Sequence, residues 1–319
     1  MLKIRGMLPD VGKTLFNTAP AIFPLAFFTR GRLRMKLSTM VCALCMTATL
    51  LGSVSAQAAE GKKWTTVRIG TEGAFRPFNF TKPDGTLDGF EIDLYKVLCK
   101  SMQVACEIVV QPFTGMIPAL QAGKFDAIMS GMSATDKRRQ VIDFSVPYSN
   151  SGQTFATLKD SPLAKLPDTG MRFSLTKDEA GAVKELEKIK PALQDKVIGV
   201  QTASIAATFL NKYLQGVVKV REYKTTEEHD LDLAAGRVDL VIASVTYLNG
   251  AREKLGNANM VLAGPQFIGG LLGSGSAIGL RKSDPELKKM FDDAIMKVKQ
   301  DGTLKTLGMK WFGQDITPQ

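Results

Sequence analysis

A run of small residues that leads into basic residues, Ser130 to Arg139, is the stretch of this sequence best suited to binding an anion. Ser133 and Asp136 have the S-x-x-D spacing of a capping box, so we expect a short helix to begin at Ser133. A helix start offers unpaired N–H groups and a positive dipole end. Arg138 adds a guanidinium that binds a carboxylate through two parallel hydrogen bonds. On local pattern alone an ordinary surface helix start is the commoner explanation, but the rest of the chain favours a carboxylate clamp.

The elements that would position this stretch alternate between strand and helix. A first block has strands at residues 67–70, 104–110 and 125–129, with helices at 89–102 and 115–122. A second block repeats the order, with strands at 196–200, 217–220 and 238–243 and helices at 204–214 and 226–235. The alternation predicts an α/β fold with a doubly wound parallel sheet in each block.

Three further regions complete the pattern. The strand and helix order breaks at residues 144–149, between the two blocks. Residues 159–190 are long and polar, and we expect them to elaborate the second block. Near the end of the chain, Ser283 is expected to cap a helix that Gly302 ends, and a short helix follows at 303–312.

Polar and small residues follow several of the expected strands. They include residues 70–72 and 130–131 in the first block and residues 200–204 in the second. Ligands of open α/β sheets bind at the carboxyl ends of strands. Two such edges that face each other would enclose a cleft, and a hinge could close it. We therefore expect all three segments to lie on one ligand cleft.

Residues 30–58 have the layout of a cleaved signal peptide, so we expect residues 1–58 to be an N-terminal extension and signal peptide. A basic cluster at residues 30–36 precedes an apolar run at 37–54 and the small residues at 56–58. The small residues favour cleavage after Ala58 over retention as a membrane anchor. Residues 1–34 resemble neither a domain nor a signal, and Met35 is an alternative start.

The strong basicity of the full chain comes largely from this leader. The chain has 41 Lys and Arg against 31 Asp and Glu, and removing residues 1–58 leaves about 34 against 30. No long basic stripe with interleaved aromatics remains, so nucleic acid is a poor candidate ligand. The one histidine, His229, is expected on a solvated helix face. The sequence therefore offers few residues for a zinc site or a histidine-based triad, and we expect no metal or cofactor.

Export also bears on the cysteines. Cys99 and Cys106 are the two that remain beyond residue 58. Helical residues precede the gap between them and a strand pattern follows it. In an oxidising compartment a disulfide that staples helix to strand is expected, and two free buried thiols are the weaker alternative.

The residues now resemble a known family, the polar amino-acid solute-binding proteins of ABC importers. The resemblance rests on segments at residues 67–75, 88–94, 133–139, 301–304 and 310–312, and it covers essentially the whole chain after the leader. The chain is most similar to the lysine/arginine/ornithine-binding branch and, nearer still, to octopine and nopaline binders. The cysteine pair matches the disulfide of that branch. Residues 222–228, the insert after residues 160–162 and the terminal residues 317–319 resemble the opine side.

This resemblance implies a two-lobed periplasmic-binding-protein fold of type II, with a doubly wound sheet in each lobe and two hinge strands between them. Lobe 1 would span residues 59–150 and 265–319, and lobe 2 residues 151–264. The resemblance also implies a periplasmic monomer that binds a cationic amino acid or an opine by hinge closure. Arginine, ornithine, lysine, histidine, octopine and nopaline all stay open as ligands. A cognate ABC permease in the inner membrane would be its partner, and no catalysis would be needed.

The resemblance also implies how the ligand's α-carboxylate is held. Arg138 would bind it, helped by Ser133 and by the N–H and hydroxyl of Ser204 across the cleft. Charge-assisted hydrogen bonds of this kind each contribute about 1.5–3 kcal/mol. Two or three of them, with stacking, suffice for a micromolar Kd, or roughly −8 kcal/mol.

The other end of the ligand would be held by aromatic and acidic residues. Phe75 and Phe113 match aromatics that sandwich the ligand side chain, where their faces attract a cation. Glu72 matches an acid that faces the distal cationic group, and Ser130 and Gly131 would offer a carbonyl and small-residue contacts. The alternatives are core packing for the two phenylalanines and a surface loop acid for Glu72.

The sequence departs from the family pattern at two positions. Basic amino-acid binders usually have an aspartate after the last strand of the second block, and the matching residue here is Ser244. A serine carries no charge for an α-ammonium, which suits a substituted amine such as that of an opine. Ala203 stands where glycine is common, and it would be strained if its backbone needs a positive φ.

Two other classes of function compete with a transport receptor. Exported dehydratases that act on prephenate-like acids share the fold, and Glu72 could serve as the pocket acid that protonates a leaving group. Glu72 beside two aromatics suits a cation better than a dianion, however. A sensory domain is the third class. The sequence shows no later membrane span that would link it to a receptor.

Overall fold

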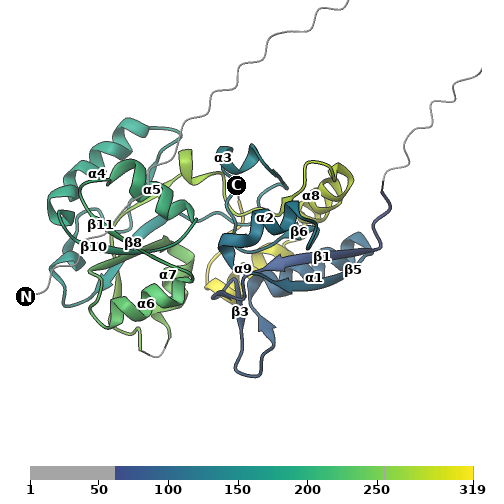
Figure 1. Cartoon of the computed structure of the whole chain (residues 1–319), viewed down its shortest axis with the longest axis horizontal. Helices are drawn as coiled ribbons and strands as arrows, with labels where there is room; N and C mark the ends of the chain where they lie inside the picture. Colours follow the sequence, from purple (N-terminus) through teal and green to yellow (C-terminus); the bar gives the residue numbers. More distant parts are fainter. Residues whose placement is uncertain (1–61, 255, 319) are drawn as a thin grey trace, which may run out of the picture. The chain divides into compact units, whose positions relative to one another are not determined.

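Two lobes of strands and helices make up the described part of the chain (Figure 1). The computed structural model describes residues 62–254 and 256–318, which belong to one unit of residues 57–319. The leader expected at residues 1–58 lies outside the described residues. No helix in the described ranges combines the length and apolar character that crossing a membrane requires.

The sheet of the first lobe has the strand order β5-β1-β6-β14-β7. Its strands are β1 (Thr66–Thr71), β5 (Ala105–Val110), β6 (Ala127–Ile128), β7 (Asp143–Phe144) and β14 (Gly279–Leu280). β1 runs parallel to β5 and β6, while β14 is antiparallel to β6 and β7. The chain therefore leaves β1, β5 and β6 at the same edge of the sheet, as the sequence predicted.

Helices cover both faces of this sheet because each presents an apolar stripe. The helices on one face are α1 (Phe90–Met102), α8 (Pro285–Gln300) and α9 (Thr303–Phe312), which share one core with β1. α2 (Met116–Gln121) and the short helix η1 (Phe113–Gly115) pack against the other face. Asp284, not Ser283, occupies the N-cap position of α8. A small antiparallel sheet follows β1 and consists of β2 (Ala74–Phe75), β3 (Asn79–Thr81) and β4 (Leu87–Asp88).

The sheet of the second lobe has the order β11-β10-β12-β8-β13-β9. Its strands are β8 (Gln153–Leu158), β9 (Arg172–Ser174), β10 (Val197–Gln201), β11 (Lys219–Tyr223), β12 (Leu240–Ser244) and β13 (Met260–Ile268). β10, β11 and β12 are parallel, and β8 is antiparallel to β12 and β13. The predicted lobe boundary between residues 264 and 265 falls inside β13, and the division into lobes at those residues stays a prediction.

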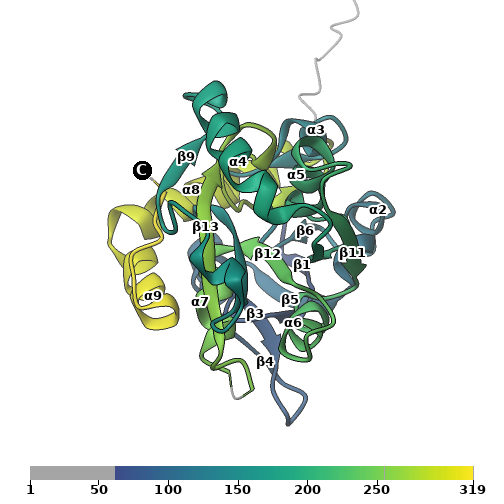
Figure 2. The ribbon, with the colours of Figure 1, turned by 90° about the vertical axis from the view of Figure 1, so that its left-hand side faces the viewer.

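The second sheet is also covered on both faces, as Figure 2 shows. α4 (Glu179–Leu193) and α5 (Ile205–Tyr213) pack on one face, next to the short helices η2 (Pro162–Lys165) and η3 (Gly270–Leu272). α6 (Thr226–Ala234) and α7 (Val245–Arg252) pack on the other. The polar segment at residues 159–190 contributes η2, β9 and most of α4 to this lobe, as predicted.

Two extended segments join the lobes and run side by side. We name residues 145–152 the first hinge segment and residues 273–278 the second. They are bonded to each other: the Tyr148 N–H donates to the Ser276 carbonyl at 2.9 Å, and the Ser276 N–H donates to the Ser149 carbonyl at 2.9 Å. The chain thus has the predicted two-lobed α/β fold with two hinge strands.

Two local predictions in the second lobe were wrong. β11 begins at Lys219 rather than Val217, because Val217 and Val218 pack against the core while the strand itself is largely exposed. His229 is fully buried, not solvated. It lies on the face of α6 that packs on the sheet, with its ring between those of Tyr223 and Tyr247.

A disulfide links Cys99 in α1 to Cys106 in β5, which confirms the predicted staple. We expect the double substitution Cys99→Ser with Cys106→Ser to lower the free energy of unfolding by about 2 kcal/mol, because a bond with a sequence separation of 7 restricts the unfolded chain. Urea unfolding under oxidising conditions measures this loss. Reductant should lower wild-type stability and leave the double variant unchanged; equal stability of the two proteins in oxidising buffer would contradict the prediction.

Candidate functional site

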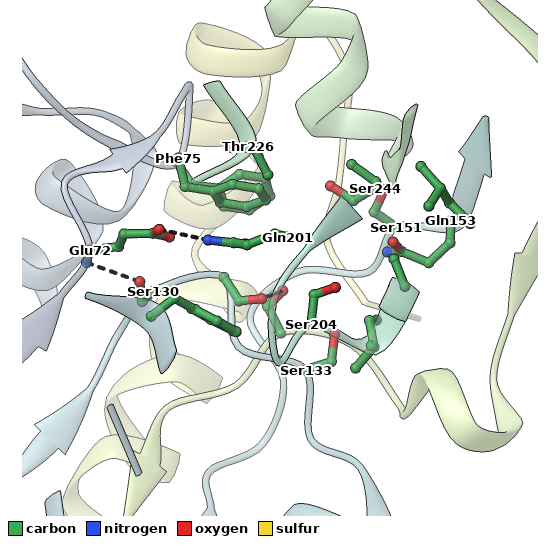
Figure 3. A pocket seen from close by; sticks show the side chains of 18 of the residues that line it. Glu72, Phe75, Ser130, Ser133, Ser151, Gln153, Gln201, Ser204, Thr226 and Ser244 are labelled. Carbon is green, nitrogen blue, oxygen red and sulfur yellow. Dashed lines mark hydrogen bonds between the residues drawn. The ribbon is translucent and has the colours of Figure 1, made fainter. Parts of the chain in front are cut away.

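All nine residues that the sequence predicted for ligand binding line one cavity between the lobes (Figure 3). They are Glu72, Phe75, Phe113, Ser130, Gly131, Ser133, Arg138, Ser204 and Ser244. The cavity has a volume of about 660 Å³, counting the space that opens to solvent. Figure 3 shows Glu72 and Phe75 on one side of it and Ser151, Gln153 and Ser244 on the opposite side. A setting between two lobes, lined by aromatic and polar side chains, is typical of a small-molecule site.

Arg138 is carried by the short helix α3 (Asp136–Arg139), whose start differs from the prediction. The N-cap is Thr135, whose hydroxyl accepts a hydrogen bond from the Arg138 N–H at 3.2 Å. Ser133 cannot cap the helix because it pairs as an extended residue with Ser276 of the second hinge segment. The neighbouring Ala134 N–H also donates to the Gly275 carbonyl, at 2.9 Å. Because Ser133 and Ala134 bond to the second hinge segment, α3 begins two residues later than predicted.

The Arg138 guanidinium lies where both lobes meet. Nη1 donates to the Ser133 carbonyl at 2.9 Å, and Nη2 donates to the Ala203 carbonyl of the second lobe at 3.1 Å. Its central carbon is 5.6 Å from the centre of the Phe113 ring. Burial lowers the pKa of Arg138 to about 10, so it stays charged at neutral pH. In the described part of the chain only neutral groups hydrogen-bond to this cation, so it is suited to an incoming anion.

Glu72 is the acid of the cavity. It follows β1, it is 7% exposed, and its Oε1 accepts a hydrogen bond from Gln201 Nε2 at 2.6 Å. Its N–H donates to Ser130 Oγ at 3.0 Å. Burial raises the pKa of Glu72 to about 8, and the Gln201 bond only partly offsets that rise. A buried carboxyl of this kind becomes ionised readily when a cation enters the site.

Aromatic rings form the wall next to Glu72. Phe75 lies nearly parallel to Tyr247 of the second lobe, with ring centres 4.9 Å apart, and stacks on Phe78 at 5.1 Å. The wall leaves no room for a side chain at Gly131, whose φ is +60° and whose added Cβ would lie 2.7 Å from the Phe75 ring. Glycine is therefore required at this position both by its backbone conformation and by the close approach of Phe75.

The second lobe contributes two helix starts. The Ser204 hydroxyl caps α5 by accepting from the Ala207 N–H at 3.1 Å, and the Ser244 hydroxyl caps α7 by accepting from the Tyr247 N–H at 3.2 Å. Both serines line the cavity. Ala203 directly precedes Ser204 and has a φ of +61°. The sequence predicts strain at this alanine if its φ is positive, and the structure shows that it is.

Several lining residues were missed by sequence reasoning. Gln201, the last residue of β10, was expected on the cleft and was not missed, but nothing in the sequence indicated its bond to Glu72. Ser151, Gln153 and Ser276 come from the hinge segments and the start of β8, where no motif marks them. Thr226 was expected only as the start of a helix. These residues enter the cavity because the two lobes close around it.

Comparison with known proteins agrees with this arrangement. The model of the bacterial extracellular solute-binding proteins, family 3, matches residues 67–314. The chain belongs to that family. The family 3 protein described here is 42% identical to the octopine-binding periplasmic protein of Rhizobium meliloti over 302 residues, or 89% of this chain and 100% of the relative.

Other relatives extend the comparison. The family 3 protein is 35% identical to an L-arginine-binding protein of Pseudomonas aeruginosa, over 78% of this chain and 89% of the relative. It also superimposes on an ancestral arginine-binding protein bound to glutamine with a TM-score of 0.66 and 32% identity, covering 79% of this chain and all of the other. The relatives named here are binding proteins. In residues 62–254 and 256–318 no group of three or more His, Cys, Asp or Glu side chains is placed to hold a metal ion.

The contact between Gly131 and Phe75 can be tested against a matched glycine. Gly123 also has a positive φ, of +73°, but an added Cβ would meet nothing within 4 Å. We expect Gly123→Ala to cost about 1–2 kcal/mol of stability from backbone strain alone. Gly131→Ala should cost about 1–3 kcal/mol more, because the ring of Phe75 must move. Denaturant unfolding measures both, and equal losses would show that Phe75 does not constrain the position.

Proposed function

We propose that this chain is the periplasmic receptor of an ABC importer for a cationic amino acid or an opine. The observation that carries the proposal is the pair of opposite charges in one cavity. Among the described residues that line it, Arg138 has the one cationic side chain and Glu72 the one carboxylate. Arg138 would hold the ligand's carboxylate, with Ser133 and Ser204 completing the site. Glu72 would hold the distal ammonium or guanidinium.

The surroundings of Glu72 support a cationic ligand group. Phe75 and Phe113 present aromatic surface to the same cavity, and aromatic faces attract guanidinium and ammonium groups. Ser130 and Gly131 add a hydroxyl, a carbonyl and a small surface. A buried carboxyl and a buried guanidinium that contact only neutral groups are costly in the free protein. A ligand that carries the two complementary charges would relieve both costs at once.

Within this class we favour an opine. The side of the cavity opposite Glu72 has Ser151, Gln153 and Ser244, which offer hydroxyl and amide groups and no charge. A free α-ammonium would lack a carboxylate partner there, whereas a secondary amine with its extra substituent needs mainly space and hydrogen bonds. The 42% identity to an octopine-binding protein supports the same choice.

Binding would couple to closure of the lobes. Contacts already cross the cleft, from Gln201 to Glu72, from Arg138 to Ala203 and between the Phe75 and Tyr247 rings. We propose that the two lobes, predicted as residues 59–150 with 265–319 and residues 151–264, swing about the hinge segments, with the end of β13 and η3 moving with lobe 2. A ligand that touches both lobes favours the closed form, which a cognate inner-membrane permease would recognise. We propose that the receptor acts as a monomer after cleavage of its leader.

The receptor would be a binding protein, not an enzyme. The dehydratase alternative needs Glu72 to donate a proton to a leaving group on a dianionic substrate. The Oε1 of Glu72 instead accepts from the Gln201 amide, and the aromatic faces of the same cavity attract a cation rather than a dianion. Prephenate therefore enters the test below as a competing ligand.

A ligand screen tests the proposal. The exported protein is unfolded and refolded to remove bound ligand, and its melting temperature is measured with arginine, ornithine, lysine, histidine, glutamine, octopine, nopaline and prephenate. A ligand at a hundred times its Kd adds about 2.7 kcal/mol of stability. We expect octopine or nopaline to give the largest shift. A larger shift with a free basic amino acid would reject the opine preference, and a shift with prephenate alone would reject the receptor function.

The pH dependence of binding should report the charge of Glu72. The carboxyl holds its proton below pH about 8, so a cation must displace that proton to bind. We expect affinity for a cationic ligand to rise by about tenfold per pH unit from pH 6 to 8 and to level off above pH 8. Isothermal titration calorimetry in two buffers of different ionisation enthalpy measures both affinity and proton release.

Substitutions separate Glu72 from Arg138 in this experiment. Glu72→Gln should weaken cationic ligands and remove the rise with pH, with little effect on a ligand that has a neutral side chain. Arg138→Ala should weaken every ligand and leave the slope with pH unchanged, because the guanidinium is charged throughout that range. A Glu72→Gln variant that keeps the wild-type slope would assign the titration to another group.

A further inference from the structure

One acidic side chain near the cavity is buried and does not line it. Glu91 lies in the first turn of α1 and is 1% exposed. Its Oε1 accepts hydrogen bonds from the Gly131 N–H, at 2.7 Å, and from the Tyr148 hydroxyl. Its Oε2 accepts from Asn79 Nδ2 at 2.5 Å. Three donors from three separate segments thus converge on one carboxylate.

Each donor belongs to a segment that shapes the cavity. Gly131 lies in the loop after β6, next to Ser130 and under the Phe75 ring. Asn79 links Glu91 to the loop after β1, because its Oδ1 accepts a hydrogen bond from the Gly73 N–H at 2.7 Å. Gly73 follows Glu72 directly. The Glu91 carboxylate therefore reaches both loops that carry first-lobe residues of the cavity.

The third donor belongs to the hinge. Tyr148 is fully buried in the first hinge segment, and its N–H is bonded to Ser276 of the second hinge segment. Ser276 also pairs with Ser133 in the loop before α3. A shift of the Tyr148 hydroxyl would therefore displace the cavity loops, and a shift of those loops would displace the hinge segments.

We propose that Glu91 is a positioning residue, a buried carboxylate that holds the loop after β1, the loop after β6 and the first hinge segment in one arrangement. It touches no ligand and acts through Gly73, Gly131 and Tyr148. Burial raises the pKa of Glu91, and its three hydrogen bonds oppose that rise because they favour the ionised form, which accepts from all three donors. A glutamine amide of the same shape cannot accept all three bonds. The inference rests on the proposed function only for its binding readout.

The chemistry of the site predicts how Glu91→Gln would act. The amide oxygen would stay with Gly131 and Tyr148, which both donate to one position. The amide NH2 would then face Asn79 Nδ2, donor against donor. Asn79 can relieve this by turning its own amide over, but its Oδ1 then no longer accepts from the Gly73 N–H. Glu91→Gln should therefore release the loop next to Glu72 and leave Gly131 in place, whereas Glu91→Leu should release both loops.

Residue-resolved amide exchange of the ligand-free protein tests this without a ligand. In Glu91→Gln we expect the Gly73 amide to exchange at least about tenfold faster, with Gly131 near the wild-type rate. In Glu91→Leu both amides should exchange faster. Glu286→Gln, which removes one charge at an exposed position on α8, is the matched control and should change neither. The β1 amide of Ile69 reports general destabilisation.

The results separate the inference from its alternatives. Wild-type rates at Gly73 in Glu91→Gln would overturn it, even if Glu91→Leu does not fold. Equal acceleration at Gly73, Gly131 and Ile69 would overturn it too, because that is the result of a purely structural residue. In a protein that binds a cationic ligand, Glu91→Gln should weaken that ligand about tenfold or more and a neutral one less, since the loop beside Glu72 is the one released. Failure of the wild type to bind any cation would reject the proposed function and leave the exchange result to decide the role of Glu91.

Discussion

The structure keeps two opposite charges apart inside one cavity. Arg138 is held by backbone carbonyls of both lobes, and Glu72 is held by the amide of Gln201, so neither charge is neutralised by the other. Placing charged groups in a buried site without an ionic partner is unfavourable, and the lowered pKa of Arg138 and the raised pKa of Glu72 express that cost. Other features of the site fit this separation: strand ends that face each other, rings beside the acid, and lobes that meet around the ligand.

Keeping the charges of Arg138 and Glu72 apart requires cavity loops with fixed positions. Side-chain hydrogen bonds help to fix the loops after β1 and β6: the Gly73 N–H donates to Asn79, and the Gly131 N–H donates to Glu91. Asn79 and Glu91 supply these bonds from the small sheet and from α1, and Tyr148 extends them to the hinge. A cavity built in this way can stay ordered in one lobe while the other lobe moves, which suits a receptor that closes on its ligand.

The errors of sequence reasoning have a common physical origin. Ser133 has the spacing of a capping residue, but pairing with Ser276 draws it into an extended conformation and Thr135 caps the helix instead. His229 sits among charged residues in the sequence, yet its face of α6 is the one that packs on the sheet. In both cases a contact with a residue distant in the chain overrode the local pattern, and local patterns carry no information about such contacts.

The sequence by itself determined the alternation of strands and helices and the loops that follow the strands, because side-chain periodicity and turn residues act over short distances. The individual cavity residues were predicted mainly from the resemblance of those loops to the motifs of a known family, and the structure places all nine on one cavity. It also predicted the disulfide, since only six residues lie between the two cysteines and a helix meets a strand there. Only the tertiary structure decided that Gln201 bonds to Glu72, that Tyr247 covers Phe75, and that Glu91 joins two loops to the hinge. Those contacts join residues from 40 to 172 positions apart or cross between lobes, and they exist only once the chain is packed.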